Sequence, residues 1–251
     1  MRILKYEDND FEIICQKKLY IKDKHKLEYF QLESKKIDTL DATLFYPYKE
    51  KLSKNFIYFF LTLIMVLFIY NYINVSLLQK EIGPLPDTYK TVFVMASYFI
   101  INLILHELSH ILSLKLFGKK FNKVGIKLNY YIFPSFYVQM NEIYMLSKNE
   151  KIFVHISGIL TNLIFMTFIQ YVNIRWINDE ALTRGYMYFM LDMVWNIAPF
   201  LNSDGYKTLI TLLDMDEFTD RKENSKFIKI IQLLSILMVL HTVFNWILFY
   251  L

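Results

Sequence analysis

Two histidines and a glutamate form the group best suited to chemistry in this 251-residue sequence, within His106-Glu107-Leu108-Ser109-His110. Positions i and i+4 of a helix lie on one face, so both imidazoles can bind one zinc ion. Zinc lowers the pKa of a bound water to about 7, and Glu107 is placed to act as general base toward that water. The spacing therefore predicts a catalytic zinc site on a helix.

A catalytic zinc ion takes three protein ligands and leaves a fourth position open. Asp204 is the candidate third ligand, because it follows a long apolar segment and directly precedes Gly205. An isolated Asp-Gly pair is more often a turn, but the topology expected below brings this carboxylate to the same depth as the two histidines. We therefore predict one zinc ion per chain, with His106, His110 and Asp204 as its ligands.

The segments that must position these residues are apolar. Hydrophobic residues make up 55% of the chain, above the roughly 45–50% of soluble proteins. Segments approaching the roughly 20 residues needed to cross a bilayer lie at about 56–73, 91–117, 152–172, 186–201 and 227–251. The expected fold is an all-α polytopic membrane protein with about five transmembrane helices. The fourth segment is short and contains Asp192, Asn196 and Pro199, which predicts a tilt, a kink or a break.

Basic residues alternate between the loops. Lysine and arginine number 12 in residues 1–55, 2 in 74–90, 7 in 115–151, 2 in 173–185 and 5 in 202–229, which accounts for all 28. The positive-inside rule then predicts a multi-pass protein of the cell membrane, with a cytoplasmic N terminus and a C terminus outside. A net charge of +4 is too small and too scattered to predict nucleic-acid binding. The single cysteine, Cys15, excludes an internal disulfide.

Two segments outside the expected spans carry patterns of their own. Residues 1–54 form the expected cytoplasmic N-terminal segment, and their 12 basic and 10 acidic residues predict some strand or an amphipathic stretch on the membrane. Residues 55–251 form the membrane-embedded domain. Within residues 118–150, apolar and polar residues alternate around Pro134, which predicts a small β-hairpin between the second and third spans. Its edge can recruit an extended peptide, although a purely structural hairpin explains the pattern equally well.

The other polar residues of the spans form less distinctive patterns. His155 begins the third span, either as an interfacial histidine or as a group that binds substrate or a ligand carboxylate. His241, deep in the last span, predicts a hydrogen bond between helices. Asp192 lies four residues before Asn196, hence on the same helical face, and either supports the site or is structural.

Three motifs follow one another along residues 91–210. The His-Glu-x-x-His motif comes first, Gly158-Ile159-Leu160-Thr161-Asn162 second, and the run from Asn196 through Pro199 to Asp204-Gly205 third. In this order they resemble the site-2 protease family of intramembrane zinc metallopeptidases. The resemblance is specific, because it rests on all three motifs and not on the histidine pair alone.

The resemblance implies a role for each matching residue. His106, His110 and Asp204 would hold zinc, and Glu107 would be the catalytic acid and base. Asn162 and Asn196 would position the substrate or stabilise developing charge. The chain has no insertion long enough for a PDZ domain, and Ser203 stands where many relatives have leucine. Its compact form, with Leu146-Ser147-Lys148 after a Phe-Tyr-Val run, resembles the small bacterial peptide zinc metalloproteases.

The expected function is therefore that of an intramembrane zinc endopeptidase. It would hydrolyse a peptide bond of a membrane-associated peptide or transmembrane segment near the cytoplasmic face, in the maturation of a secreted or modified peptide. An inactive membrane metal-binding protein that retains or chaperones a peptide would keep the ligands without needing Glu107. A transporter is a third reading, which the lack of a recognisable repeat disfavours. The substrate and the oligomeric state stay open.

Overall fold

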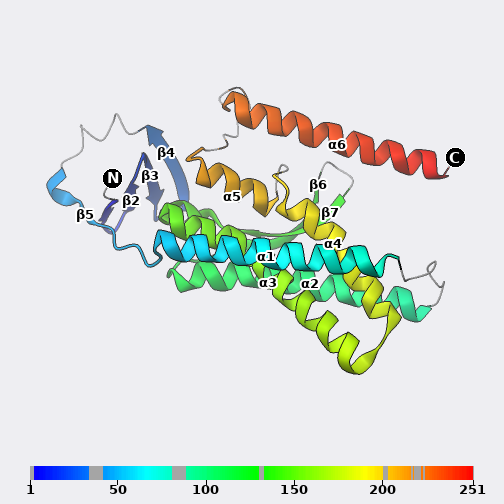
Figure 1. Cartoon of the computed structure of the whole chain (residues 1–251). Coiled ribbons are helices and arrows are strands. Elements are labelled where there is room, and N and C mark those ends of the chain that lie inside the picture. The colour runs from blue at the N-terminus through cyan, green and yellow to red at the C-terminus, as the bar shows by residue number, and fades with distance from the viewer. Residues whose placement is uncertain are drawn as a thin grey trace.

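The computed structural model describes residues 3–33, 42–80, 89–129, 133–199, 203–215, 217, 222 and 224–250 (Figure 1). A β-sheet built from the N-terminal residues lies at one end of a group of long helices, and a two-stranded hairpin joins two of those helices (Figure 1). This is a mixed fold of helices and sheet. The expected all-α fold is therefore wrong.

The N-terminal sheet is antiparallel, with the order β4-β3-β2-β1-β5. Its strands are β1 (Leu4–Glu7), β2 (Phe11–Cys15), β3 (Lys18–Asp23), β4 (Glu28–Glu33) and β5 (Tyr46–Pro47). Ile14 and Tyr20 of this sheet pack with Met145 of the 3-10 turn η3 (Asn141–Met145). The strand expected as one alternative for residues 1–54 is thus confirmed, and its short segments, with charged residues between the apolar ones, are not span-like.

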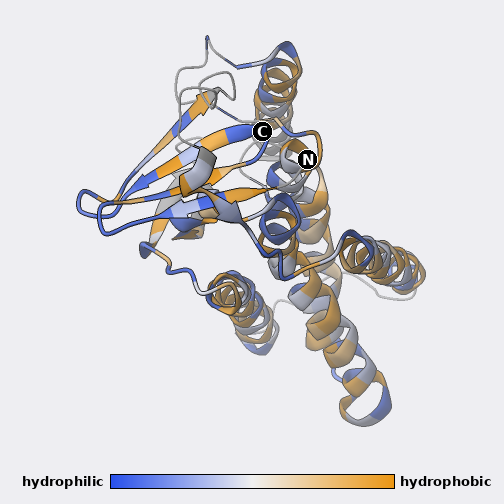
Figure 2. Cartoon of the chain, turned by 90° about the vertical axis from the view of Figure 1, so that its left-hand side faces the viewer, coloured by the Kyte–Doolittle hydropathy of each residue, from blue (hydrophilic) through white to orange (hydrophobic). Residues whose placement is uncertain are grey.

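Three of the described helices are long and apolar enough to cross a membrane. They are α1 (Lys54–Leu78), α2 (Tyr89–Leu116) and α3 (Lys148–Val172), which the π-helical turn η4 (Asn173–Ile177) extends to Ile177. The expectation of about five spans is corrected to these three. Figure 2 shows hydrophobic residues along the helices and hydrophilic ones in the turns of the sheet.

The two remaining expected spans correspond to other helices. The fourth is α4 (Glu180–Ile197), which begins six residues earlier than expected and includes the charged residues Glu180, Arg184 and Asp192. It ends just before Ala198, whose extended conformation follows from the proline at position 199. A short helix, α5 (Asp204–Leu212), comes next, and α6 (Lys226–Tyr250) ends the described chain.

The helices turn apolar side chains outward and bury polar ones. Phe59 on α1 and Phe93 on α2 are exposed, whereas Asn71 on α1 is completely buried. The amide of Asn71 donates to Thr167 Oγ1 at 2.8 Å and accepts from the hydroxyl of Tyr186 at 2.8 Å. Polar side chains that join helices from within, beneath an apolar exterior, are typical of helices packed in lipid. Residues on α1, α3 and α4 are thereby fixed together.

The predicted hairpin is present between α2 and α3. It consists of β6 (Lys123–Asn129) and β7 (Phe133–Gln139), paired antiparallel from Lys123 opposite Gln139 to Asn129 opposite Phe133. Gly125 faces the ring of Tyr137, where an added Cβ would come within 3.1 Å of the ring. The glycine therefore lets the tyrosine lie across the neighbouring strand.

Ion pairs anchor the N-terminal sheet to the segments that join the helices. Lys119 donates to Glu12 Oε1 at 2.6 Å, and Lys22 donates to Glu142 Oε1 at 2.5 Å. Glu12 is almost fully buried. Burial opposes ionisation of Glu12, but Lys119 and Lys5 outweigh it and hold the pKa of this carboxyl below its ordinary value. Glu12 is therefore a charged anchor of the sheet.

A capping box at the start of α3 also binds the segment between β5 and α1. Ser147 Oγ accepts from the backbone N–H of Glu150, and Glu150 Oε2 accepts from the backbone N–H of Ser147 at 2.9 Å. The same carboxylate accepts from the Tyr48 hydroxyl at 2.6 Å and from the Lys51 N–H at 2.9 Å. The chain entering α1 is thereby tied to the beginning of α3.

Candidate metal centre

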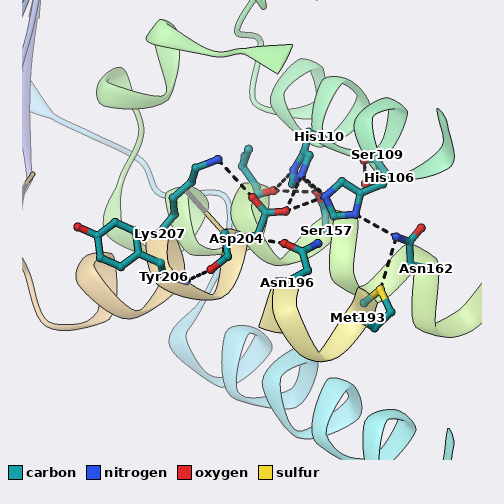
Figure 3. A network of polar contacts seen from close by, with 12 residues as sticks. His106, Ser109, His110, Ser157, Asn162, Met193, Asn196, Asp204, Tyr206 and Lys207 are labelled. Carbon is teal, nitrogen blue, oxygen red and sulfur yellow. Dashed lines mark hydrogen bonds and ion pairs between the residues drawn. The ribbon is translucent and has the colours of Figure 1, made fainter. Parts of the chain in front are cut away.

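Three buried side chains from two helices converge on one point (Figure 3). His106 and His110 lie one turn apart on α2, and Asp204 is the first residue of α5. Asp204 Oδ2 lies 2.8 Å from Nε2 of His106 and 3.0 Å from Nε2 of His110, and the two Nε2 atoms are 3.2 Å apart. The structure thus places together the three residues predicted as zinc ligands.

The turn between α4 and α5 orients Asp204. Ser203 is the N-cap of α5: its hydroxyl accepts from the N–H of Tyr206 at 2.9 Å and donates to the carbonyl of Ala198 at 2.8 Å. Asn196 Oδ1 accepts from the backbone N–H of Asp204 at 3.2 Å (Figure 3). Asn196 therefore holds the ligand's backbone, a role that the residues alone did not indicate.

Gly205 is required by the same turn. A Cβ at this position would lie 1.9 Å from the carbonyl oxygen of Ile197, a backbone atom at the end of α4. No side chain fits there without moving one of the two helices. Gly205 thus allows α5 to approach α4 closely, and this approach places the Asp204 carboxylate.

Gly158 on α3 leaves the room that the imidazoles occupy. A Cβ at Gly158 would lie 2.5 Å from Cε1 of His106 and 2.7 Å from Nε2 of His110. The glycine of the Gly-x-x-x-Asn element therefore packs directly on both rings, which explains why a helix interior carries glycine here despite its cost of roughly 1 kcal/mol relative to alanine.

Hydrogen bonds at the outer nitrogens fix the two rings. His110 Nδ1 lies 2.7 Å from the carbonyl oxygen of Val154, so Nδ1–H donates and the lone pair of Nε2 faces Asp204. His106 Nδ1 lies 3.1 Å from Nδ2 of Asn162, whose Oδ1 is buried without a hydrogen-bond partner in the described chain. An amide can present either atom. With Oδ1 turned to Nδ1–H, Asn162 leaves Nε2 of His106 free to bind a metal.

The donor set fits zinc. Two imidazole nitrogens and one carboxylate oxygen are common zinc ligands, with bonds of about 2.0–2.2 Å. Tetrahedral bonds of that length place ligand atoms about 3.3 Å apart, and the three separations here run from 2.8 to 3.2 Å. A shift of a few tenths of an ångström therefore converts the cluster into three corners of a zinc site.

The predicted acid and base, Glu107, lies beside this cluster. It is half-buried, and its carboxylate makes no hydrogen bond to any residue that the structure describes. Asp192 is exposed on α4 and likewise makes no hydrogen bond within the described chain. The side chain of His241 lies outside the described residues. The catalytic role of Glu107 stays a prediction.

Sequence reasoning missed Lys207. It lies one turn after Asp204 on α5, and its Nζ is 3.4 Å from Asp204 Oδ1, the oxygen turned away from the histidines (Figure 3). Its three-residue spacing from Asp204 is the only signal in the sequence. Lys207 balances the charge of the ligand and puts a cation at the rim of the site.

Comparison with known proteins identifies a close relative. The chain is 43% identical over 249 residues, covering 99% of both proteins, to the "Putative peptide zinc metalloprotease protein YydH" of Bacillus subtilis (strain 168). No family model matches the sequence, and no solved structure matches the fold. With this identity over nearly the full length of both proteins, the chain belongs to the zinc metalloprotease family that YydH represents.

Proposed function

We propose that this protein is an intramembrane zinc endopeptidase of the site-2 protease type, a multi-pass protein with a cytoplasmic N terminus. One observation carries the proposal: His106, His110 and Asp204 meet in a buried cluster on helices packed among three membrane-length ones. Ionisable residues within a membrane segment are costly and mark functional sites. The relationship to a zinc metalloprotease supports the same chemistry.

Each residue of the site has a defined task in peptide hydrolysis. Zinc, when bound by the three ligands, supplies a Lewis acid that activates water and polarises the scissile carbonyl. Glu107 accepts the proton of that water on its carboxylate and returns it to the nitrogen of the leaving amine. No hydrogen bond to a described residue competes for that carboxylate.

The two asparagines act on different parts of the site. Asn162 contacts Nδ1 of His106, so it keeps that ring in the tautomer that binds metal. Asn196 uses its Oδ1 on the backbone of Asp204, which leaves its Nδ2 to donate to a substrate carbonyl. Both roles refine the expectation that these residues position substrate.

The test combines metal content with turnover in the detergent-purified full chain. We expect about one zinc per wild-type chain, loss of zinc in His106→Ala and Asp204→Ala, and full zinc content without hydrolysis in Glu107→Gln. Hydrolysis is followed with a library of quenched fluorescent peptides in extended conformation. A folded wild-type protein that takes up no zinc when zinc is supplied would contradict the proposal. Hydrolysis that survives Glu107→Gln would contradict the assignment of the base.

A further inference from the structure

A large cleft lies between the N-terminal sheet, the starts of α1 and α3, and α5. Its volume is about 1120 Å³, and its walls come from β4, the start of α3, and α5 with the residues that follow it. At one end lies Lys207, whose ammonium is 3.4 Å from Asp204. At the other end lies β4, beside the last turn of α5 (Figure 1). The cleft therefore lies along α5, between the sheet and the lysine that contacts Asp204.

One wall of this cleft is an open strand edge. β4 is the last strand of the sheet, and in the part of the chain that the structure describes no strand pairs with its outer side. Residues 29–32 of β4 line the cleft. Edge strands present unpaired N–H and C=O groups that bind an extended chain as an added strand. The wall is thus suited to a peptide backbone.

The cleft carries an excess of positive charge. Its described lining contains six lysines against two acids, Asp214 and Glu217. Asp214 forms ion pairs with two of those lysines, with Lys17 at 2.5 Å and with Lys148 at 2.9 Å. The amino nitrogen of Lys151 lies 3.8 Å from the centre of the Tyr20 ring, whose face stabilises this group when it is protonated. The lysines of the lining therefore outnumber its acids, and one of them, Lys207, contacts the Asp204 carboxylate of the metal centre.

We propose that this cleft binds an acidic, extended segment of the substrate as a sixth strand on β4 and directs the adjoining residues to the metal centre. The inference rests on the proposed function, since it names the substrate class for that site. The volume exceeds the roughly 300–1,000 Å³ of a small-ligand pocket, which favours a polymer. An open strand edge favours a peptide over an anionic lipid headgroup, which has no backbone to pair with it.

Binding is measured with the full-length Glu107→Gln protein loaded with zinc in detergent. The probes are a fluorescein-labelled peptide of alternating glutamate and valine, a matched peptide with lysine in place of glutamate, and the acidic peptide with alternate backbone nitrogens methylated. We expect the acidic peptide to bind at least about tenfold more tightly than either of the others. Methylation removes the donors that strand pairing needs, whereas the charge stays the same.

Two matched variants locate the interaction. Lys54 lines the cleft at the start of α1 and is exposed, so Lys54→Glu should weaken binding of the acidic peptide about tenfold. Lys26, an exposed residue of the turn before β4, does not line the cleft, and Lys26→Glu should leave binding within twofold. Equal effects of the two variants would show only a general charge effect and would overturn the proposal.

Three further outcomes are decisive. Equal affinity for the methylated and unmethylated acidic peptides would exclude strand pairing. Displacement of the acidic peptide by phosphatidylglycerol vesicles, but not by phosphatidylcholine vesicles, would identify the cleft as a headgroup site. Zinc content of the same preparation separates the two proposals: protein that holds zinc but no peptide contradicts the cleft alone, whereas protein that binds peptide without zinc contradicts the proposed function alone.

Discussion

At the scale of single residues, the site depends on two glycines as much as on its ligands. The two imidazoles fit because Gly158 has no side chain, and Asp204 reaches them because Gly205 has none. His106 and His110 owe their orientation to groups on α3, namely Asn162 and the carbonyl of Val154. Outer contacts of this kind set the tautomer and the basicity of metal ligands.

Gly158→Ala should remove zinc while leaving the fold intact. The new methyl would lie 2.5 Å from His106, so the ring must leave its ligand position. We expect zinc affinity to fall by about 10- to 100-fold, as for loss of an outer contact to a ligand, measured by competition with a chromophoric chelator. Thr161→Ala, also on α3, serves as the control. Wild-type affinity in Gly158→Ala would show that α3 does not confine the rings.

At the scale of elements, the docking of the N-terminal sheet should depend on the charge of Glu12. The pKa of Glu12 is held below its ordinary value in the folded chain by Lys119 and Lys5, against the effect of burial. A carboxylate whose pKa is lower in the folded than in the unfolded chain stabilises the fold at pH values above its unfolded pKa of about 4.3. This stabilisation is lost as the pH falls through the folded-state pKa. The sheet is therefore anchored most firmly near neutral pH.

Glu12→Gln tests this anchor by hydrogen exchange of residues 3–33. At pH 7 the free energy of opening of the sheet should be lower in the variant than in wild type by about 1 kcal/mol, the typical net value of an intramolecular hydrogen bond. The difference should shrink as pH falls below about 4, since wild type then loses the same charge. A difference that persists unchanged at low pH would mean that Glu12 acts through packing and not through charge.

Sequence patterns predict features within one element better than contacts between elements. The four-residue spacing of His106 and His110 fixes one helical face, and the β6–β7 hairpin follows from local alternation. Some strand was expected in residues 1–54, but the five-stranded sheet was not, because its order depends on pairings that no local pattern reveals. Lys207 was missed because its importance comes from the meeting of Asp204 on α5 with the two histidines on α2.

At the scale of the whole molecule, the metal should join parts of the chain that are distant in sequence. Asp204 lies 98 residues after His106, and both residues are buried. A ligand that binds only the folded state stabilises it by about 2.7 kcal/mol at 100 times its dissociation constant. Zinc binding is thus expected to hold α5 against α2.

Removal of zinc should therefore lower thermal stability. EDTA treatment of the wild-type protein should reduce its Tm by several degrees, and added zinc should restore it. Asp204→Ala should show the lower Tm and no response to either treatment, as followed by nano differential scanning fluorimetry in detergent. A wild-type Tm that is unaffected by EDTA, while zinc is measurably removed, would show that the metal does not bridge the helices.

The anchoring of the sheet has a consequence for the order in which the protein is made. Residues 3–33 are synthesised before the helices, yet Glu12, Gln16 and Lys17 pair with Lys119, Leu146 and Asp214, which are synthesised at least a hundred residues later. The early strands can complete these contacts only after the helices between them have been made. The sheet's contacts can therefore be complete only when α2 and α3 are in place, so that peptide access along β4 arises only in the finished molecule.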